Sequence, residues 1–155
     1  IDIVSKNGQL LLNISPRADG SIPDKQRQVL GELGKWLKVN GESIYGTRPW
    51  AIYGEGPTQM ESGGHFTKHV DYTTKDIRFT AKDGLLYAIA LGTPREETVI
   101  GALSENCEHY PGSIGSVVAL NGDYVRSWKR DAEGLKITLA EDAPEQIAYA
   151  FRIEP

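Results

Sequence analysis

The hydrophobic pattern of this 155-residue chain changes its period near residue 50. Before that point there is one continuous apolar run and one segment whose apolar residues recur every three or four positions. After it, short stretches alternate apolar and polar residues and are separated by turn residues. A period near 3.6 indicates a helix, and a period of two indicates a strand with one buried face. We therefore expect two units, one spanning residues 1–49 and the other spanning residues 50–155.

The first unit begins with an apolar run that predicts a strand. The residues from Leu10 to Ile14 contain almost no polar alternation, with Asn7-Gly8 before them and Pro16 after them. Such runs are typical of strands covered on both faces, as in a parallel sheet, although a buried helical turn has the same pattern. Nothing else in the chain alternates strand with helix. We therefore expect a buried strand whose sheet this chain does not itself provide.

An amphipathic helix is predicted from Asp24 to about Asn40. Its apolar residues recur at intervals of three and four, which places them on one face; they are Val29, Leu30, Leu33, Trp36 and Leu37. Ser21 and Asp24 have the spacing of a capping box, with Pro23 in the first turn. Asn40-Gly41 predicts a left-handed stop. The run and the helix form one strand-helix unit.

From Trp50 onward the sequence predicts an antiparallel β-sandwich. Asp83-Gly84 separates two alternating stretches and is a strong hairpin signal. Residues Pro57 to Thr74 are rich in Gly, Thr, His and Asp, which predicts a long irregular connection. Short strands at this spacing are typical of a sandwich; they are expected at Trp50–Gly56, Ile77–Thr80, Leu85–Gly92, Thr98–Leu103, Ser116–Leu120, Tyr124–Trp128, Leu135–Leu139 and Ile147–Ile153. The expected fold class is mainly β, a sandwich preceded by one strand-helix unit.

Bulk properties exclude several classes of partner. The net charge is −4 and the basic residues are scattered, so we expect no nucleic-acid partner. No stretch approaches the roughly 20 apolar residues of a membrane span, and the start lacks a secretion signal. The chain begins at Ile1 and its one methionine is Met60, which suggests a processed or cropped product. Cys107 is the only cysteine, so no internal disulfide is expected.

No metal or cofactor site is expected. His65 and His69 are four residues apart, a metal-ligand spacing on a helix, but Gly63-Gly64 indicates a loop and favours a surface pair over a zinc site. Cys107 and His109 could share one face of a strand. The acidic neighbours of Cys107 disfavour a reactive nucleophile, so we interpret this cysteine as incidental.

Several segments together carry a family resemblance. They are "DIVSKNGQLLLNISPRADGSIP" (Asp2–Pro23), "GKWLKVNGESIYGTRPW" (Gly34–Trp50), "GEGPT" (Gly54–Thr58), "DIRFTAKDGLLYAIALG" (Asp76–Gly92) and the closing "YAFRIEP". These segments resemble the end of the α-L-fucosidases of glycoside hydrolase family 29. The segment Thr93–Pro111 departs from the family, which often has Trp after the "LG". The resemblance implies a (β/α)₈ barrel followed by a β-sandwich, with this chain supplying the eighth strand and helix and the sandwich.

The resemblance also implies retaining hydrolysis of terminal α-L-fucose by an aspartate nucleophile and a separate acid/base carboxylate. Both lie upstream of the matched segment, so no catalytic residue is assigned here. Acidic residues of this chain are expected to be solvated loop charges; they include Glu55, Glu61, Asp71, Asp76, Glu96, Glu97, Glu105 and Glu108. The family resemblance suggests a periplasmic, extracellular or lysosome-like compartment.

Two residues are candidates for contact with the sugar. Barrel pockets lie at the C-terminal ends of the strands, which would place Asn13 and Ser15 at the pocket floor or just beneath it. The alternative is that both residues only satisfy the strand end and the following turn.

Two functions are therefore considered. The first is the C-terminal portion of an α-L-fucosidase that supports the upstream barrel, is inactive alone and meets fucosylated oligosaccharides or glycoconjugates through the complete enzyme. The alternative is an autonomous carbohydrate-binding or scaffold module. Five aromatic residues could form a sugar platform, although core packing is their expected role; they are Trp50, Tyr53, Tyr110, Tyr124 and Trp128. The run from Leu10 to Ile14 favours the first function, because a complete barrel would cover both of its faces.

Overall fold

The computed structural model describes residues 1–58, 70–95 and 97–155. Its elements follow one another along the chain as α1 (Asp2–Ser5), α2 (Asp24–Asn40), the 3₁₀ turn η1 (Gly41–Ser43), β1 (Arg48–Glu55), β2 (Ile77–Lys82), β3 (Leu85–Ala90), β4 (Thr98–Ile100), the 3₁₀ turn η2 (Gly101–Leu103), β5 (Ser116–Ala119), β6 (Val125–Asp131), β7 (Gly134–Leu139) and β8 (Tyr149–Glu154).

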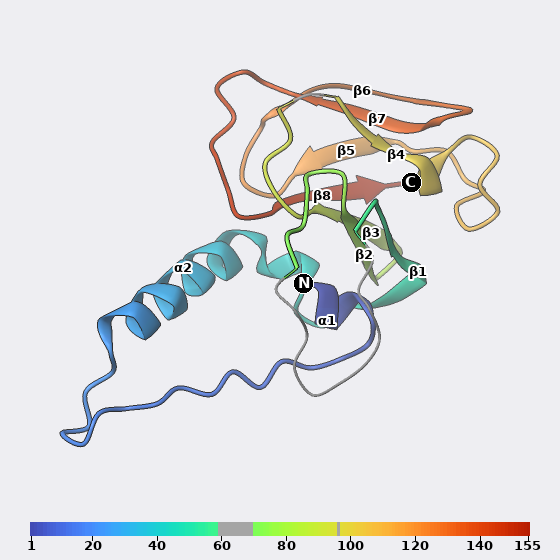
Figure 1. Ribbon diagram of the computed structural model, residues 1–155. Helices are drawn as coiled ribbons and strands as arrows, with labels where there is room; N and C mark the ends of the chain where they lie inside the picture. Colours follow the sequence, from blue (N-terminus) through green and yellow to red (C-terminus); the bar gives the residue numbers. More distant parts are fainter. Residues whose placement is uncertain (59–69, 96) are drawn as a thin grey trace.

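The strands form two antiparallel sheets, so the predicted sandwich is confirmed (Figure 1). Within the described residues, one sheet has five strands in the order β1-β2-β3-β8-β5, and the other has three in the order β4-β7-β6. The predicted hairpin is β2–β3. Its turn residues Asp83 and Gly84 both have positive φ, 52° and 82°, as a type I′ turn requires.

The main core lies between the two sheets. Alternate residues of each strand point to one face, so Phe79 of β2 and Phe151 of β8 meet Ile137 of β7 in one buried cluster. Burial of such side chains stabilises the fold by about 1.5–3 kcal/mol each. Tyr149 also lies in this cluster, as its alternation with Phe151 predicts. Ile147 does not, because it precedes β8 and is exposed.

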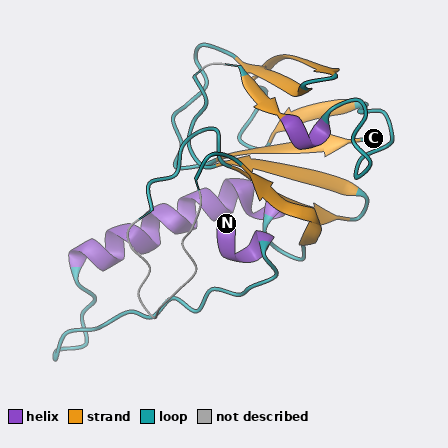
Figure 2. Cartoon of the chain, turned by 45° about the vertical axis from the view of Figure 1, so that its right-hand side comes forward, coloured by secondary structure: helices purple, strands orange, loops and turns teal. Residues whose placement is uncertain are grey.

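A second, smaller cluster holds α2 against the outer face of the five-stranded sheet. Trp36 packs there with Ile89 of β3 and Ala150 of β8. The indole N–H of Trp36 also donates to the carbonyl of Ala148 at 2.8 Å. Only the C-terminal part of the helix is fixed in this way. Figure 2 shows the opposite end of α2 extending beyond the sheets.

The predicted helix has the observed bounds, but neither predicted cap forms. The residue before the helix is Pro23, without a side-chain cap. The Ser21 hydroxyl instead donates to the Asp19 carboxylate at 2.7 Å, because that acceptor is two residues away. At the other end Gly41 is right-handed and continues into η1. A Cβ on Gly41 would lie 2.8 Å from the Tyr45 ring, so a close approach explains this glycine.

The predicted buried strand at Leu10–Ile14 is absent. Residues 9–16, which we call the N-terminal arm, have no regular structure, and Leu11 is 94% exposed. A strand requires neighbours for its backbone N–H and C=O groups, and no strand in the described part of the chain pairs with the arm. The arm is thus an extended, apolar segment that runs along α2 (Figure 1).

Candidate functional site

A large, mainly apolar hollow lies where the arm, α1, α2 and the chain before β1 meet. We call this hollow the arm groove; its volume is about 680 Å³. Most of its lining is apolar, and the lining side chains include Ile3, Val4, Leu10, Leu12, Leu33, Leu37, Ile44, Tyr45, Pro49 and Ile147. Contiguous exposed apolar surface of this kind marks an interaction site.

The arm has a second contact with α2 further along the helix. Leu12 and Ile14 meet Val29 and Leu30 around a smaller hollow of about 190 Å³. Val29 is 56% exposed although it belongs to the apolar stripe of the helix. The stripe is therefore only partly covered in this chain, and its exposed part continues the apolar surface of the arm.

The two predicted site residues lie on this arm. Asn13 lines the small hollow against α2, and its side chain is exposed. The backbone N–H of Ser15 donates to the Gln26 side-chain oxygen at 3.0 Å, which fixes the end of the arm to the helix. The residues lie two apart on one segment, so an extended conformation places their side chains on one side of it.

Helix α1, which precedes the arm, is fixed to the sandwich by a partly buried ion pair between Asp2 and Arg78. The Arg78 guanidinium, only 3% exposed, donates to the Asp2 carboxylate at 2.5 Å. Burial alone would raise the pKa of Asp2, but hydrogen bonds from Arg78 and Lys6 lower it below its ordinary value. The pair joins residues 76 apart in sequence, so no local signal could predict it.

One carboxylate that was expected to be solvated is fully buried. Asp76 accepts four hydrogen bonds of 2.7–2.9 Å, from the backbone and hydroxyl groups of Thr58 and Thr73. Gly56 lies so close that a Cβ there would be 2.5 Å from Asp76 Oδ1. The prediction that Asp76 is a solvated loop charge is therefore wrong, because hydrogen-bond donors from Thr58 and Thr73 take the place of water around its carboxylate.

A second acidic residue also has a structural role. Glu55 accepts from the backbone N–H groups of Gly101 at 2.9 Å and Ala102 at 2.8 Å. These groups begin η2, where N–H groups have no partner within the turn. Glu55 therefore joins the end of β1 to the other sheet.

Four of the five aromatic residues pack against the core, which was their expected role. Trp50, Tyr110, Tyr124 and Trp128 pack against the main core cluster. Tyr53 is half exposed, but Lys6 and Arg78 lie over its ring at 4.7 and 5.6 Å from the centroid. The five residues do not form one exposed platform.

The remaining candidates lie elsewhere. His65 and His69 fall outside the described residues, as do Glu61 and Glu96. Cys107 is a half-buried free thiol. Across the described residues, no three His, Cys, Asp or Glu side chains gather as a metal site would need. Within the same part of the chain, no helix has the length and apolar character to cross a membrane.

Comparisons with known proteins identify the relatives of this fold. A family model described as "Alpha-L-fucosidase" matches residues 1–42. The rat (Rattus norvegicus) tissue α-L-fucosidase is 30% identical over 145 residues, or 93% of this chain. The crystal structure of Thermotoga maritima α-fucosidase matches 98% of the chain with a TM-score of 0.72 and 33% identity. The chain is related to the α-L-fucosidases of glycoside hydrolase family 29. It corresponds to the C-terminal portion of these enzymes.

The match covers only part of each fucosidase. The chain spans 27% of the rat enzyme and 32% of the Thermotoga maritima chain. The amphioxus (Branchiostoma floridae) α-L-fucosidase is 37% identical over 93 residues, which is 60% of this chain and 17% of the relative. These relatives are therefore several times longer than this chain.

Proposed function

We propose that this chain is the C-terminal portion of an α-L-fucosidase and supports a catalytic barrel made by upstream residues. In this proposal residues 1–49 contribute the last strand and helix of the barrel, and residues 50–155 form the C-terminal β-sandwich. The exposed apolar arm carries the proposal, because a strand-helix unit without a sheet needs one from elsewhere.

The arm has the chemistry of a missing barrel strand. It is already extended, and successive side chains of an extended segment point to opposite sides, as a strand between a barrel interior and an outer helix layer requires. Pairing with neighbouring strands would supply partners for its backbone groups. Burial of four apolar side chains from Leu10 to Ile14 would add about 1.5–3 kcal/mol each.

In the assembled barrel Asn13 and Ser15 would lie at the C-terminal end of the eighth strand. Barrel enzymes bind their substrates at this end. The side chain of Asn13 can donate and accept hydrogen bonds, so it suits a sugar hydroxyl or a neighbouring catalytic carboxylate. Ser15 is held to α2 through Gln26, which suits the floor of a pocket.

The sandwich would position the barrel unit rather than take part in chemistry. Trp36 fixes α2 to the sandwich, and the Asp2–Arg78 pair fixes α1, which leads into the arm. Retaining glycosidases need two carboxyl groups about 5–5.5 Å apart across the scissile bond. In the proposal both come from the upstream barrel, so the chain alone is inactive.

A chimera tests this proposal. The matched C-terminal portion of the Thermotoga maritima enzyme is replaced by this chain, and nitrophenol release from a nitrophenyl α-L-fucoside is measured. We expect turnover by the chimera and none by the chain or by the truncated barrel alone. A chimera that is folded by circular dichroism but inactive would contradict the proposal, as would turnover by the purified chain that one of its own point substitutions abolishes.

A further inference from the structure

One side chain of α2 holds the end of the N-terminal arm. Gln26 is half-buried in the first turn of the helix, and its side-chain oxygen accepts a hydrogen bond from the backbone N–H of Ser15 at 3.0 Å. Gln26 and Asn13 also line the same small hollow between the arm and the helix. Gln26 is thus a neighbour of both residues that are expected at the sugar pocket.

The cap of α2 explains why this glutamine is free to bind the arm. Gln26 is the third residue of the helix, the position from which a glutamine side chain commonly reaches back to the N–H of the N-cap residue. The N-cap residue here is Pro23, which has no N–H. The Gln26 side chain therefore has no cap to close, and it bonds instead to Ser15, eleven residues earlier in the chain.

The segment that follows Ser15 is shaped by local contacts. Pro16 restricts Ser15 to extended conformations. The backbone N–H of Arg17 donates to the carbonyl of Ser21 at 2.8 Å, which closes the next turn on itself. Within the described part of the chain, Ser15 is the only residue of the arm whose backbone N–H has a hydrogen-bond partner. The bond to Gln26 is therefore the one backbone hydrogen bond that sets the position of the arm relative to α2.

We propose that Gln26 is a positioning residue for the sugar pocket of the assembled enzyme. This inference rests on the proposed function, in which the arm is the last barrel strand and its C-terminal end meets the substrate. Trp36 fixes α2 to the sandwich through the carbonyl of Ala148, and Gln26 fixes Ser15 to α2. Gln26 thereby connects the pocket floor to a helix that the sandwich holds in place.

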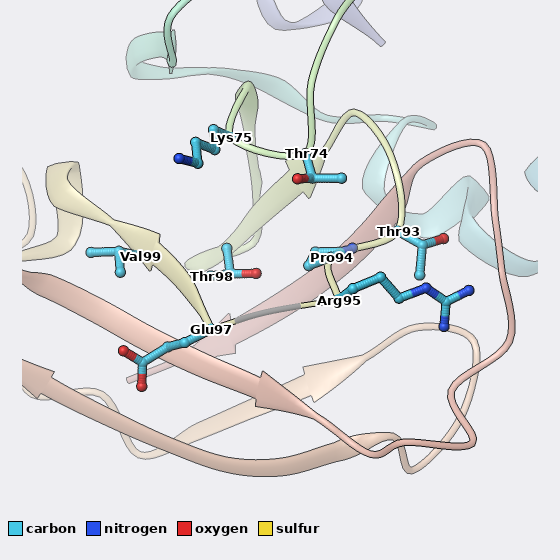
Figure 3. A pocket seen from close by; sticks show the side chains of 8 residues that line it. All are labelled: Thr74, Lys75, Thr93, Pro94, Arg95, Glu97, Thr98 and Val99. Atoms are coloured by element: carbon cyan, nitrogen blue, oxygen red, sulfur yellow. The ribbon is translucent and has the colours of Figure 1, made fainter.

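Matched control positions exist on the helix and on the sandwich. Gln28 is exposed on α2 and donates to Glu32 of the same helix at 2.8 Å. Arg95 is largely exposed and lines a polar hollow of about 620 Å³ at the start of β4 (Figure 3). None of the residues that line this hollow belongs to the arm or to α2. Gln28→Met and Arg95→Ala should therefore leave the arm unchanged.

Amide hydrogen exchange of the chain tests the bond itself. Gln26→Met nearly keeps the length of the side chain but removes its acceptor, whereas Gln26→Glu keeps an acceptor oxygen. We expect exchange of the Ser15 amide to become about threefold faster in Gln26→Met and to change by less than about twofold in Gln26→Glu and in both controls. Equal exchange of this amide in Gln26→Met and in the wild type would overturn the proposal.

Kinetics of the fucosidase chimera test the position of the pocket floor. With the nitrophenyl α-L-fucoside, Gln26→Met should raise KM about tenfold and leave kcat nearly unchanged, because a displaced floor weakens the binding of substrate and transition state alike. Gln26→Glu should restore KM to within about twofold of the parent chimera. A merely structural role would lower the melting temperature without this change in KM.

The outcomes separate this inference from the proposed function. A parent chimera that is folded but inactive would overturn both. An active parent chimera whose KM is unchanged in Gln26→Met, or is raised equally in Gln26→Met and Gln26→Glu, would overturn the role of Gln26 alone.

Discussion

At the scale of single residues, Asp76 shows how a charge can be part of a core. Its carboxylate replaces water with four donors from Thr58 and Thr73. Asp76→Asn would place an amide N–H₂ against at least one of these donors, since an amide has only one acceptor oxygen. We expect a loss of about 2–3 kcal/mol in the free energy of unfolding at pH 7, measured by urea denaturation. Asp123→Asn, at an exposed position, is the control and should change little.

The same residue gives the protein a pH dependence of stability. Burial would raise the pKa of Asp76, but the hydrogen bonds from Thr73 and Thr58 lower it below its ordinary value. A lowered pKa in the folded state stabilises the fold at pH values above the unfolded pKa of about 3.9, and this contribution is lost as the pH falls through the folded value. The difference in the free energy of unfolding between wild type and Asp76→Asn should therefore become smaller below about pH 4. A constant gap from pH 7 to pH 3 would contradict this origin.

At the scale of elements, the sequence predicted what is local and missed what is not. The bounds of α2 and the β2–β3 hairpin follow from periodicity and the Asp83-Gly84 turn. The sequence predicts a strand for the arm, because a continuous apolar run is typical of buried strands. Whether that strand forms depends on a neighbouring strand to pair with, and no strand in the described part of the chain pairs with the arm. The ion pair between Asp2 and Arg78 and the bonds from Thr58 to Asp76 join distant segments, so their residues have no distinctive spacing. The predicted roles of Asn13 and Ser15 remain proposals that only the assembled barrel can test.

One side chain of β6 makes four hydrogen bonds to η2 and the loop that follows it. Arg130 of β6 donates to the carbonyls of Leu103, Ser104, Tyr110 and Gly112 and so holds residues 103–112 against the sandwich. Lysine cannot reproduce this planar fork of donors. We expect Arg130→Lys to open the loop locally and to speed alkylation of Cys107 about tenfold. A tenfold increase corresponds to a fall of about 1.4 kcal/mol in the free energy of local opening. Arg126→Lys on the same strand is the control, and an unchanged alkylation rate in Arg130→Lys would show that the loop is held by other contacts.

At the scale of the whole molecule, the core of the sandwich is buried while the arm is exposed to solvent. The same leucine-to-alanine substitution should therefore change the free energy of unfolding differently in the two parts. Leu11 is 94% exposed, whereas Leu103 is fully buried. In the isolated chain, Leu11→Ala should change the free energy of unfolding by less than about 0.5 kcal/mol, and Leu103→Ala should cost about 2–5 kcal/mol. In the chimera with the Thermotoga maritima barrel, Leu11 would be buried between strands and helices. Leu11→Ala should then also cost about 2 kcal/mol or more, measured by thermal or urea denaturation of both proteins. An equally small effect of Leu11→Ala in both proteins would mean that the arm does not enter the barrel.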